Sequence, residues 1–166
     1  MENNTEILNK LQSGDKGLIA EAIQAVQENG DLNIAETLLA TLHNIQDQRL
    51  ETVIVNLLAD IKEKSFADVV IRQIKETTDP SLKNQLLRIV WESSLDYTAH
   101  LELFIRLLQD EDFSIAFEAS TVIENMVHNL TPAQREHLHT VICAFPEEKH
   151  FLVENIHEEM ECPEEE

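Results

Sequence analysis

Residues 79–90 read DPSLKNQLLRIV and combine a helix start with a helical apolar face. Asp79 is a residue type that caps helix N-termini, and Pro80 follows at the first helical position, where its missing amide hydrogen removes no hydrogen bond. Apolar side chains come three, seven, ten and eleven residues after Asp79. This is the spacing of one face of an α-helix, so the stretch predicts a helix that starts near residue 80 and buries that face.

The same pattern repeats along the chain at intervals of 32, 32 and 33 residues. Asp15, Asp47 and Asp112 occupy the position of Asp79, and each is followed three residues later by an apolar one. The matching apolar columns are Leu18, Leu50, Leu82 and Ile115; Ala22, Ile54, Leu86 and Ala119; Ala25, Leu57, Ile89 and Val122; and Val26, Leu58, Val90 and Ile123. The four helices are therefore equivalent elements of an internal repeat.

Another apolar helix precedes each of these four, so the repeating unit is a helical hairpin. A fifth, more divergent pair occupies 131–160, where Thr131 and Gln134 form a capping box and Pro146 separates the two helices. Helices are predicted at 4–12, 15–29, 33–44, 48–62, 65–77, 80–94, 97–109, 113–128, 132–144 and 147–160.

Hairpins of this length cannot bury their apolar faces alone and become stable by stacking on their neighbours. The sequence therefore predicts an all-α chain of about five antiparallel helix pairs in an α-solenoid. Residues 1–160 are expected to form one domain, and the acidic segment 161–166 is expected to be a disordered tail.

The paired-helix period, the Asp at the turn between helices and the apolar columns resemble the HEAT-repeat family of armadillo-type α-solenoids, in its short bacterial form. The resemblance covers nearly the whole chain and implies a right-handed superhelix whose second helices line a concave groove. One feature departs from the family. Many HEAT repeats carry Val-Arg after the turn Asp, and this chain has Leu-Glu, Leu-Lys or Ile-Ala at that point.

Composition and charge limit the classes of function. Gly (3) and Pro (4) are scarce, which favours long helices over a β-sandwich. Thirty-two acidic and twelve basic side chains give a net charge of −20, which opposes binding to nucleic-acid phosphates and to anionic membranes. The net charge is −7 for 1–61, 0 for 62–106, −5 for 107–145 and −8 for 146–166. We expect no nucleic-acid partner and no membrane association.

The N-terminal residues lack the basic and apolar regions of a signal peptide, and no stretch approaches eighteen apolar residues. Cys143 and Cys162 do not form a disulfide framework, so we expect reduced thiols and a cytoplasmic protein. Cys143 lies in the apolar run 141–145, which predicts a buried structural thiol rather than a nucleophile.

The face of the second helices that points away from the core is mostly small or polar, as a solvated face should be. Trp91, Phe117 and Arg88 are the exceptions, and Trp and Arg are enriched where proteins bind partners. The candidate groove residues are Asn84, Arg88, Trp91, Phe117 and Thr121. Under a competing interpretation, Trp91 packs between repeats and Phe117 contacts the last helix pair.

A metal site is a second hypothesis. Glu136 and His139 form one Glu-x-x-His motif, and Glu154 and His157 form another on the next predicted helix. Di-iron carboxylate bundles use two such motifs together with two further Glu residues. A solenoid offers no four-helix channel for those further ligands, and about one Glu-x-x-His is expected by chance, so we expect neither a metal nor a cofactor.

The leading functional hypothesis is a non-catalytic interaction module, or scaffold, that binds a basic or polar protein segment in its groove. The alternatives are an enzyme, either metal-dependent or of the HEAT-like lyase or glycosylase type, and an acidic inhibitor that mimics DNA. A HEAT-like glycosylase needs a basic groove, which this acidic chain lacks. A HEAT-like lyase would act on a bilin, and no residue identifies a bilin site. A DNA mimic needs a regular array of surface carboxylates, which the neutral segment 62–106 interrupts.

Overall fold

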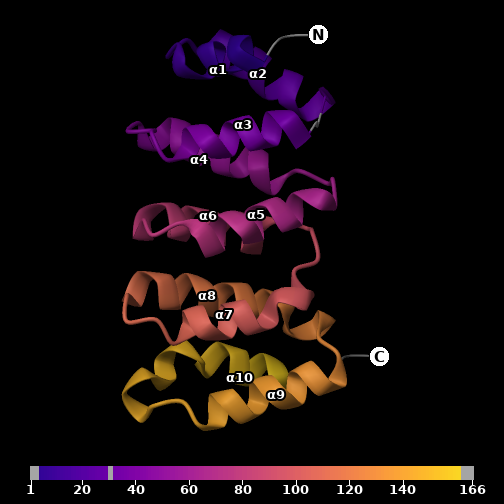
Figure 1. Ribbon diagram of the computed structural model, residues 1–166, viewed down its shortest axis with the longest axis vertical. Helices are drawn as coiled ribbons and strands as arrows, with labels where there is room; N and C mark the ends of the chain where they lie inside the picture. The colour runs from indigo at the N-terminus through magenta and orange to yellow at the C-terminus, as the bar shows by residue number, and fades with distance from the viewer. Residues whose placement is uncertain (1–3, 30–31, 162–166) are drawn as a thin grey trace. The chain divides into compact units, whose positions relative to one another are not determined.

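The computed structural model describes residues 4–29 and 32–161, and within these ranges all regular structure is helical. The elements are α1 (Asn4–Gln12), α2 (Lys16–Asn29), α3 (Leu32–Leu42), α4 (Gln48–Ala59), α5 (Ser65–Glu76), α6 (Pro80–Glu92), η1 (Thr98–His100), α7 (Leu101–Leu108), α8 (Phe113–Met126), η2 (Val127–Asn129), α9 (Pro132–Cys143), η3 (Glu147–Leu152) and α10 (Glu154–Glu161) (Figure 1). The predicted all-α fold is confirmed. Of the predicted tail, residues 162–166 lie outside the described residues.

All four Asp residues predicted as N-caps hold the first turn of a helix. The Asp47 carboxylate accepts hydrogen bonds of 2.8 and 3.4 Å from the backbone N–H groups two and three residues later. Asp15 accepts the same two bonds at 2.7 and 3.1 Å, and Asp112 accepts them at 2.9 and 3.4 Å. Asp79 accepts one at 3.0 Å from Ser81. These bonds satisfy backbone donors that have no partner inside the helix.

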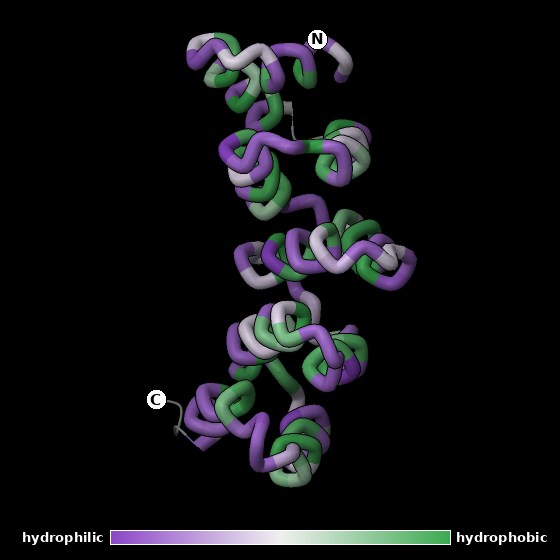
Figure 2. The backbone as a smooth tube through the Cα atoms, turned by 90° about the vertical axis from the view of Figure 1, so that its left-hand side faces the viewer, coloured by the Kyte–Doolittle hydropathy of each residue, from purple (hydrophilic) through white to green (hydrophobic). Residues whose placement is uncertain are grey.

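The predicted apolar columns are buried, apart from the column nearest the caps and Ala25, which is half-buried. The second column is fully covered, with Ala22, Ile54, Leu86 and Ala119 each at 0% exposure. In the first column Ile115 is buried, Leu50 and Leu82 are half-buried, and Leu18 is 38% exposed. This column lies in the first helical turn, where fewer neighbouring side chains cover it. Figure 2 shows the alternation of hydrophobic and hydrophilic residues along the helices.

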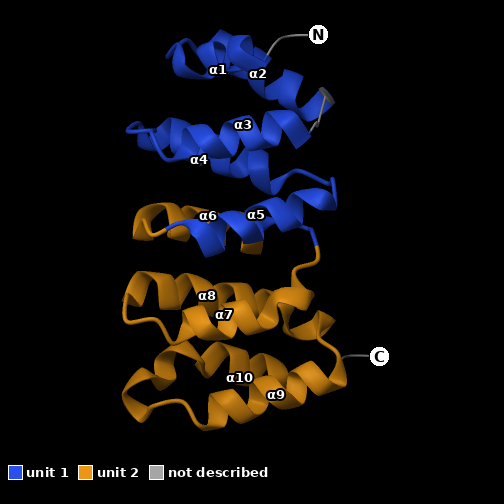
Figure 3. Ribbon diagram, in the orientation of Figure 1, with its two compact units in different colours: residues 1–77, 92–95 blue, residues 78–91, 96–166 orange. Residues whose placement is uncertain are grey.

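The chain divides into two compact units (Figure 3). Unit 1 comprises residues 1–77 and 92–95, and thus contains α1 to α5. In this unit α1 packs on α2 and α3 packs on α4. The first helices of successive hairpins also contact one another, α1 with α3 and α3 with α5, and α2 contacts α4. A hydrogen bond of 2.7 Å from Lys62 Nζ to Ser94 Oγ attaches the segment 92–95 to this unit.

Unit 2 comprises residues 78–91 and 96–166 and contains α6 to α10. In it α7 packs along α8, and α10 contacts α8, α9 and η3. The predicted helix 97–109 begins as the 3-10 turn η1, and the one predicted at 147–160 is wrong as a continuous α-helix. After Pro146 the chain forms i→i+3 bonds, from Lys149 N–H to Pro146 O and from Val153 N–H to His150 O, each 2.9 Å long. The first half is therefore a 3-10 helix, and α10 starts after Val153.

Within the described residues, no helix combines the length and the apolar character that crossing a membrane requires.

Candidate binding surface

Three exposed phenylalanine side chains of unit 2 form a group in which the middle ring, that of Phe113, contacts the other two. Phe113 and Phe151 are each 58% exposed, and Phe117 is 53% exposed. The ring centroid of Phe113 lies 6.0 Å from that of Phe117 and 5.8 Å from that of Phe151, and both pairs are tilted. These are distances at which aromatic rings attract one another. We call these three residues the aromatic surface.

Local sequence places two of the three rings. Phe113 is the first residue of α8, directly after the N-cap Asp112, and Phe117 lies one turn later on the same helix face. The buried face of α8 is formed by other positions, among them Ile115 and Ala119. Both rings therefore project from a helix whose remaining apolar side is already packed.

The third ring comes from η3, which is fixed to α8 by a buried hydrogen bond. The hydroxyl of Ser120, which is only 7% exposed, donates to the backbone oxygen of Leu152. The His150 imidazole donates to the backbone oxygen of Phe145 across 3.0 Å and holds the start of the same segment. Because Leu152 faces the core, its neighbour Phe151 points outward toward Phe113.

A hollow of about 610 Å³ adjoins Phe151, between the end of α9, η3 and α10. Its lining includes the apolar residues Ile142 and Val153 and the carboxylate residues Glu154 and Glu158. Both Glu side chains are exposed. The hollow therefore offers apolar side chains and two negative charges directly beside the aromatic surface.

Two of the predicted groove residues connect α6 to α8. The Asn84 amide donates to Ser114 Oγ at 2.8 Å, and the Trp91 indole N–H donates to Glu118 Oε2 at 2.8 Å. Both side chains are half-buried. The sole Trp of the chain thus lies beside α8. Its hydrogen-bond partner, Glu118, is the residue that follows Phe117 in sequence.

The other three predicted groove residues lie on the same two helices. Arg88 is half-buried on α6, between Asn84 and Trp91 in sequence. The Thr121 hydroxyl donates to the backbone oxygen of Phe117 at 3.2 Å, so it is directed along its own helix. Of the five predicted residues, Phe117 is the one that belongs to the aromatic surface.

The structure places the two histidines of the predicted Glu-x-x-His motifs near each other. The His139 and His157 rings lie with centroids 6.2 Å apart, and His157 Nδ1 lies 3.4 Å from Glu161 Oε1. Among the described residues, no three His, Cys, Asp or Glu side chains are grouped so that they could hold a metal ion. Glu136 and Glu154, the carboxylates of the two motifs, are exposed on their own helices and complete no such group.

The expectation that Cys143 is a buried thiol is wrong, because its side chain is exposed. It follows the buried Ile142 at the end of α9, and one residue along a helix turns the side chain about 100° to another face. Its sulfur lies 3.6 and 3.7 Å from the two ring nitrogens of His139. A sulfur almost equidistant from both nitrogens lies in line with neither N–H direction.

Sequence reasoning missed Phe113 and Phe151. The signal for Phe113 was present: Phe113 and Phe117 form an apolar pair at i and i+4 that lies outside every core column. Phe151 had no comparable signal, because its direction depends on the 3-10 conformation of η3 and on the bond from Ser120.

No family model matches the chain, and comparisons with curated proteins and with solved structures give no significant match.

Proposed function

We propose that this chain is a non-catalytic protein-binding module, and that unit 2 holds a partner segment on the aromatic surface. The observation that carries the proposal is the group of three Phe rings, each more than half exposed, in which Phe113 contacts both Phe117 and Phe151. Contiguous exposed apolar groups of this kind are uncommon on proteins unless they bind something. A partner that covers the rings gains roughly 25 cal/mol for each Å² of apolar surface removed from water.

The charge around the aromatic surface favours a basic partner. Glu111 and Asp112 directly precede Phe113, and Glu154 and Glu158 line the hollow beside Phe151. The segment 107–145 carries −5 and the segment 146–166 carries −8. An amphipathic segment with apolar side chains on one face and Lys or Arg on its edges would match both features. A second copy of this chain is a poorer match, since it brings the same negative charge.

The finer architecture is part of the same proposal. We take the hairpins to stack as a right-handed HEAT-like α-solenoid that acts in the cytoplasm. Support comes from the four equivalent Asp caps and, within unit 1, from the contacts of α1 with α3, α3 with α5, and α2 with α4. Under this proposal Asn84 and Trp91 support α8 from α6, and Phe117 contacts the partner.

The proposal is tested with two designed peptides of about 18 residues, long enough to present a helical face. One peptide has a Leu face flanked by Lys, and the other has the same Leu face flanked by Glu. Trp91 fluorescence reports binding, since the indole lies next to α8. We expect the Lys peptide to bind in the micromolar range, and the Glu peptide at least about tenfold more weakly because of like-charge repulsion.

Phe117→Ser supplies the site-specific arm of this test, and Leu18→Ser is its matched control. Leu18 is also an exposed apolar side chain on a second helix of a hairpin, and it lies in unit 1. Phe117→Ser should lower the affinity for the Lys peptide about tenfold or more, whereas Leu18→Ser should leave this affinity unchanged. Equal binding of both peptides, or equal effects of both substitutions, would contradict the proposal.

A further inference from the structure

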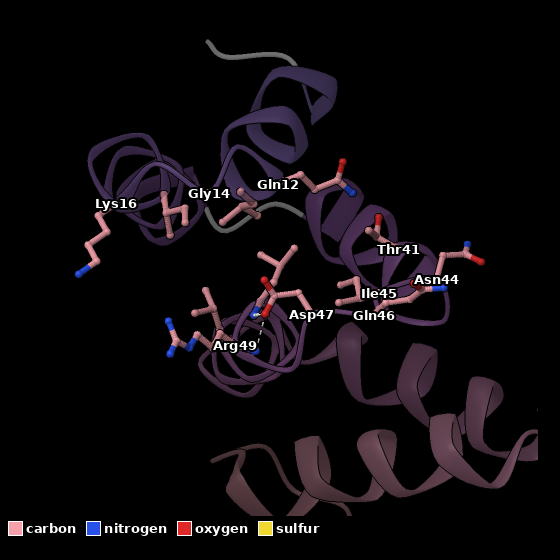
Figure 4. A pocket seen from close by; sticks show the side chains of 13 residues that line it. Gln12, Gly14, Lys16, Thr41, Asn44, Ile45, Gln46, Asp47 and Arg49 are labelled. Atoms are coloured by element: carbon pink, nitrogen blue, oxygen red, sulfur yellow. Dashed lines mark hydrogen bonds between the residues drawn. The ribbon is translucent and has the colours of Figure 1, made fainter.

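A pocket of about 420 Å³ lies in unit 1, between the turn that joins α1 to α2 and the turn that joins α3 to α4 (Figure 4). This volume is within the range of small-molecule sites, roughly 300–1,000 Å³. Gly14 shapes its rim with φ of +73°, a left-handed conformation that other residues adopt only with strain. The pocket shares no residue with the aromatic surface.

The inner wall of the pocket is apolar. Ile19, Ile45, Leu50 and Val53 line it, and all four are half-buried rather than fully packed. Leu11, which is 1% exposed, closes it from α1. Leu50, a predicted core position in the first turn of its helix, thus keeps part of its side chain open to this pocket. An apolar group that enters would cover these side chains.

Two cations stand at the mouth. Lys16 and Arg49 line the pocket and are exposed, and neither side chain has a hydrogen-bond or ion-pair partner among the residues that the structure describes. Figure 4 shows both extending on the same side of the pocket. The carboxylate that lines the pocket belongs to Asp47, and one of its oxygens accepts the capping bonds of α4.

This charge pattern is opposite to that of its surroundings. Residues 1–61 carry a net charge of −7, with Lys10, Lys16 and Arg49 as their three basic side chains. Lys10 is paired with Glu21 at 3.1 Å, whereas Lys16 and Arg49 have no such partner among the described residues, and both line this one pocket. Two exposed cations beside an apolar wall suit a ligand that brings both an anion and a hydrocarbon part.

We propose that this pocket binds a small amphipathic carboxylate. The hydrocarbon part covers Ile19, Leu50 and Val53, and the carboxylate lies at the mouth between Lys16 and Arg49. A guanidinium offers a planar pair of donors that matches a carboxylate, and the lysine ammonium adds a second charge-assisted bond. The amide side chains of Gln12, Asn44 and Gln46 also line the pocket, away from the two cations (Figure 4).

The test uses decanoate as the probe, titrated into the ¹⁵N-labelled full chain at low ionic strength while amide chemical shifts are recorded. We expect shifts in residues 11–19 and 41–53, with saturation. Decan-1-ol has the same chain without charge and should bind at least about tenfold more weakly, and the decyltrimethylammonium cation should cause no saturable shift there.

Lys16→Gln and Arg49→Gln should each weaken decanoate binding roughly fivefold, the loss expected for one exposed charge pair. Lys64→Gln is the matched control, because Lys64 is another exposed cation of unit 1 and lies outside the pocket. It should leave the affinity unchanged. These exposed substitutions are expected to preserve the fold, which the unperturbed amide spectrum of each variant verifies.

The proposal is overturned if decanoate causes no saturable shift, or if decan-1-ol binds equally well. It is also overturned if the shifts centre on unit 2, or if Lys64→Gln weakens binding as much as Arg49→Gln.

Discussion

The first turns of α2 and α8 are built in the same way and present opposite surfaces. Asp15 and Asp112 each accept two backbone hydrogen bonds with almost the same lengths. The next residue is Lys16 in one helix and Phe113 in the other. One turn thus contributes a cation to the pocket of unit 1, and the other contributes a ring to the aromatic surface of unit 2. The cap is the constant element of the repeat, and the residue after it determines which side chain the turn adds to the surface.

The largest effect is expected when the aromatic surface is removed. The triple variant Phe113→Ser, Phe117→Ser, Phe151→Ser should lose about 100-fold or more in affinity for the Lys peptide, since clustered aromatic anchors carry most of the binding energy of an interface. Its folding free energy should change little, because all three rings are more than half exposed. Calorimetric titration and urea unfolding measure the two quantities. A stable triple variant with unchanged affinity for the Lys peptide would show that the aromatic surface is not the binding site.

The bond that fixes η3 to α8 should have the largest effect on stability among these changes. Ser120→Ala leaves the buried Leu152 carbonyl without its donor, at a cost of about 1–3 kcal/mol of folding free energy. The substitution should also lower the affinity for the Lys peptide, because Phe151 loses its fixed position. Ser81→Ala, at an exposed Ser of α6, should change stability by less than about 0.5 kcal/mol. Equal unfolding midpoints for the two variants would show that the bond contributes nothing.

Much of this fold could be predicted because its determinants are local. Asp caps, the capping box of Thr131 and the apolar columns are patterns within one helix, and the structure confirms them. The aromatic surface could be predicted only in part. Phe117 was identified by its helical position, whereas Phe151 depends on a 3-10 segment and on a tertiary bond from Ser120. The pocket of unit 1 depends on how two turns pack, which no sequence periodicity encodes.

Substitution of the two capping residues tests whether both caps stabilise the fold to the same extent. Asp15→Ala and Asp112→Ala should each destabilise the chain by about 1 kcal/mol, as the loss of an N-cap does. Asp112→Ala should in addition lower the affinity for the Lys peptide, because a carboxylate beside Phe113 is lost. Asp15→Ala should leave this affinity unchanged. Chemical denaturation and peptide titration distinguish the two effects. If the two caps differ by more than about 1 kcal/mol in stability, the turns are not equivalent.

The smallest effect concerns a turn at the start of η1. Thr98 donates its hydroxyl and its backbone N–H to Asp96 Oδ1 at 2.7 and 2.9 Å, and these bonds lower the pKa of the Asp96 carboxyl. A lowered pKa in the folded state stabilises the fold above the unfolded pKa, and this contribution is lost as the pH falls through the folded pKa. Thr98→Val should therefore lower the Tm at pH 7 by no more than about 4 °C, with a smaller difference near pH 2. A pH-independent difference would exclude this cause.

We propose that this chain binds a partner on the aromatic surface, with its acidic surroundings. The most direct measurement is the map of amide chemical shifts in the ¹⁵N-labelled chain during titration with the Lys peptide. We expect saturable shifts that concentrate in residues 110–121 and 147–158 and that disappear in the triple Phe variant. Shifts of equal size across unit 1, or a map that the triple variant leaves unchanged, would contradict it.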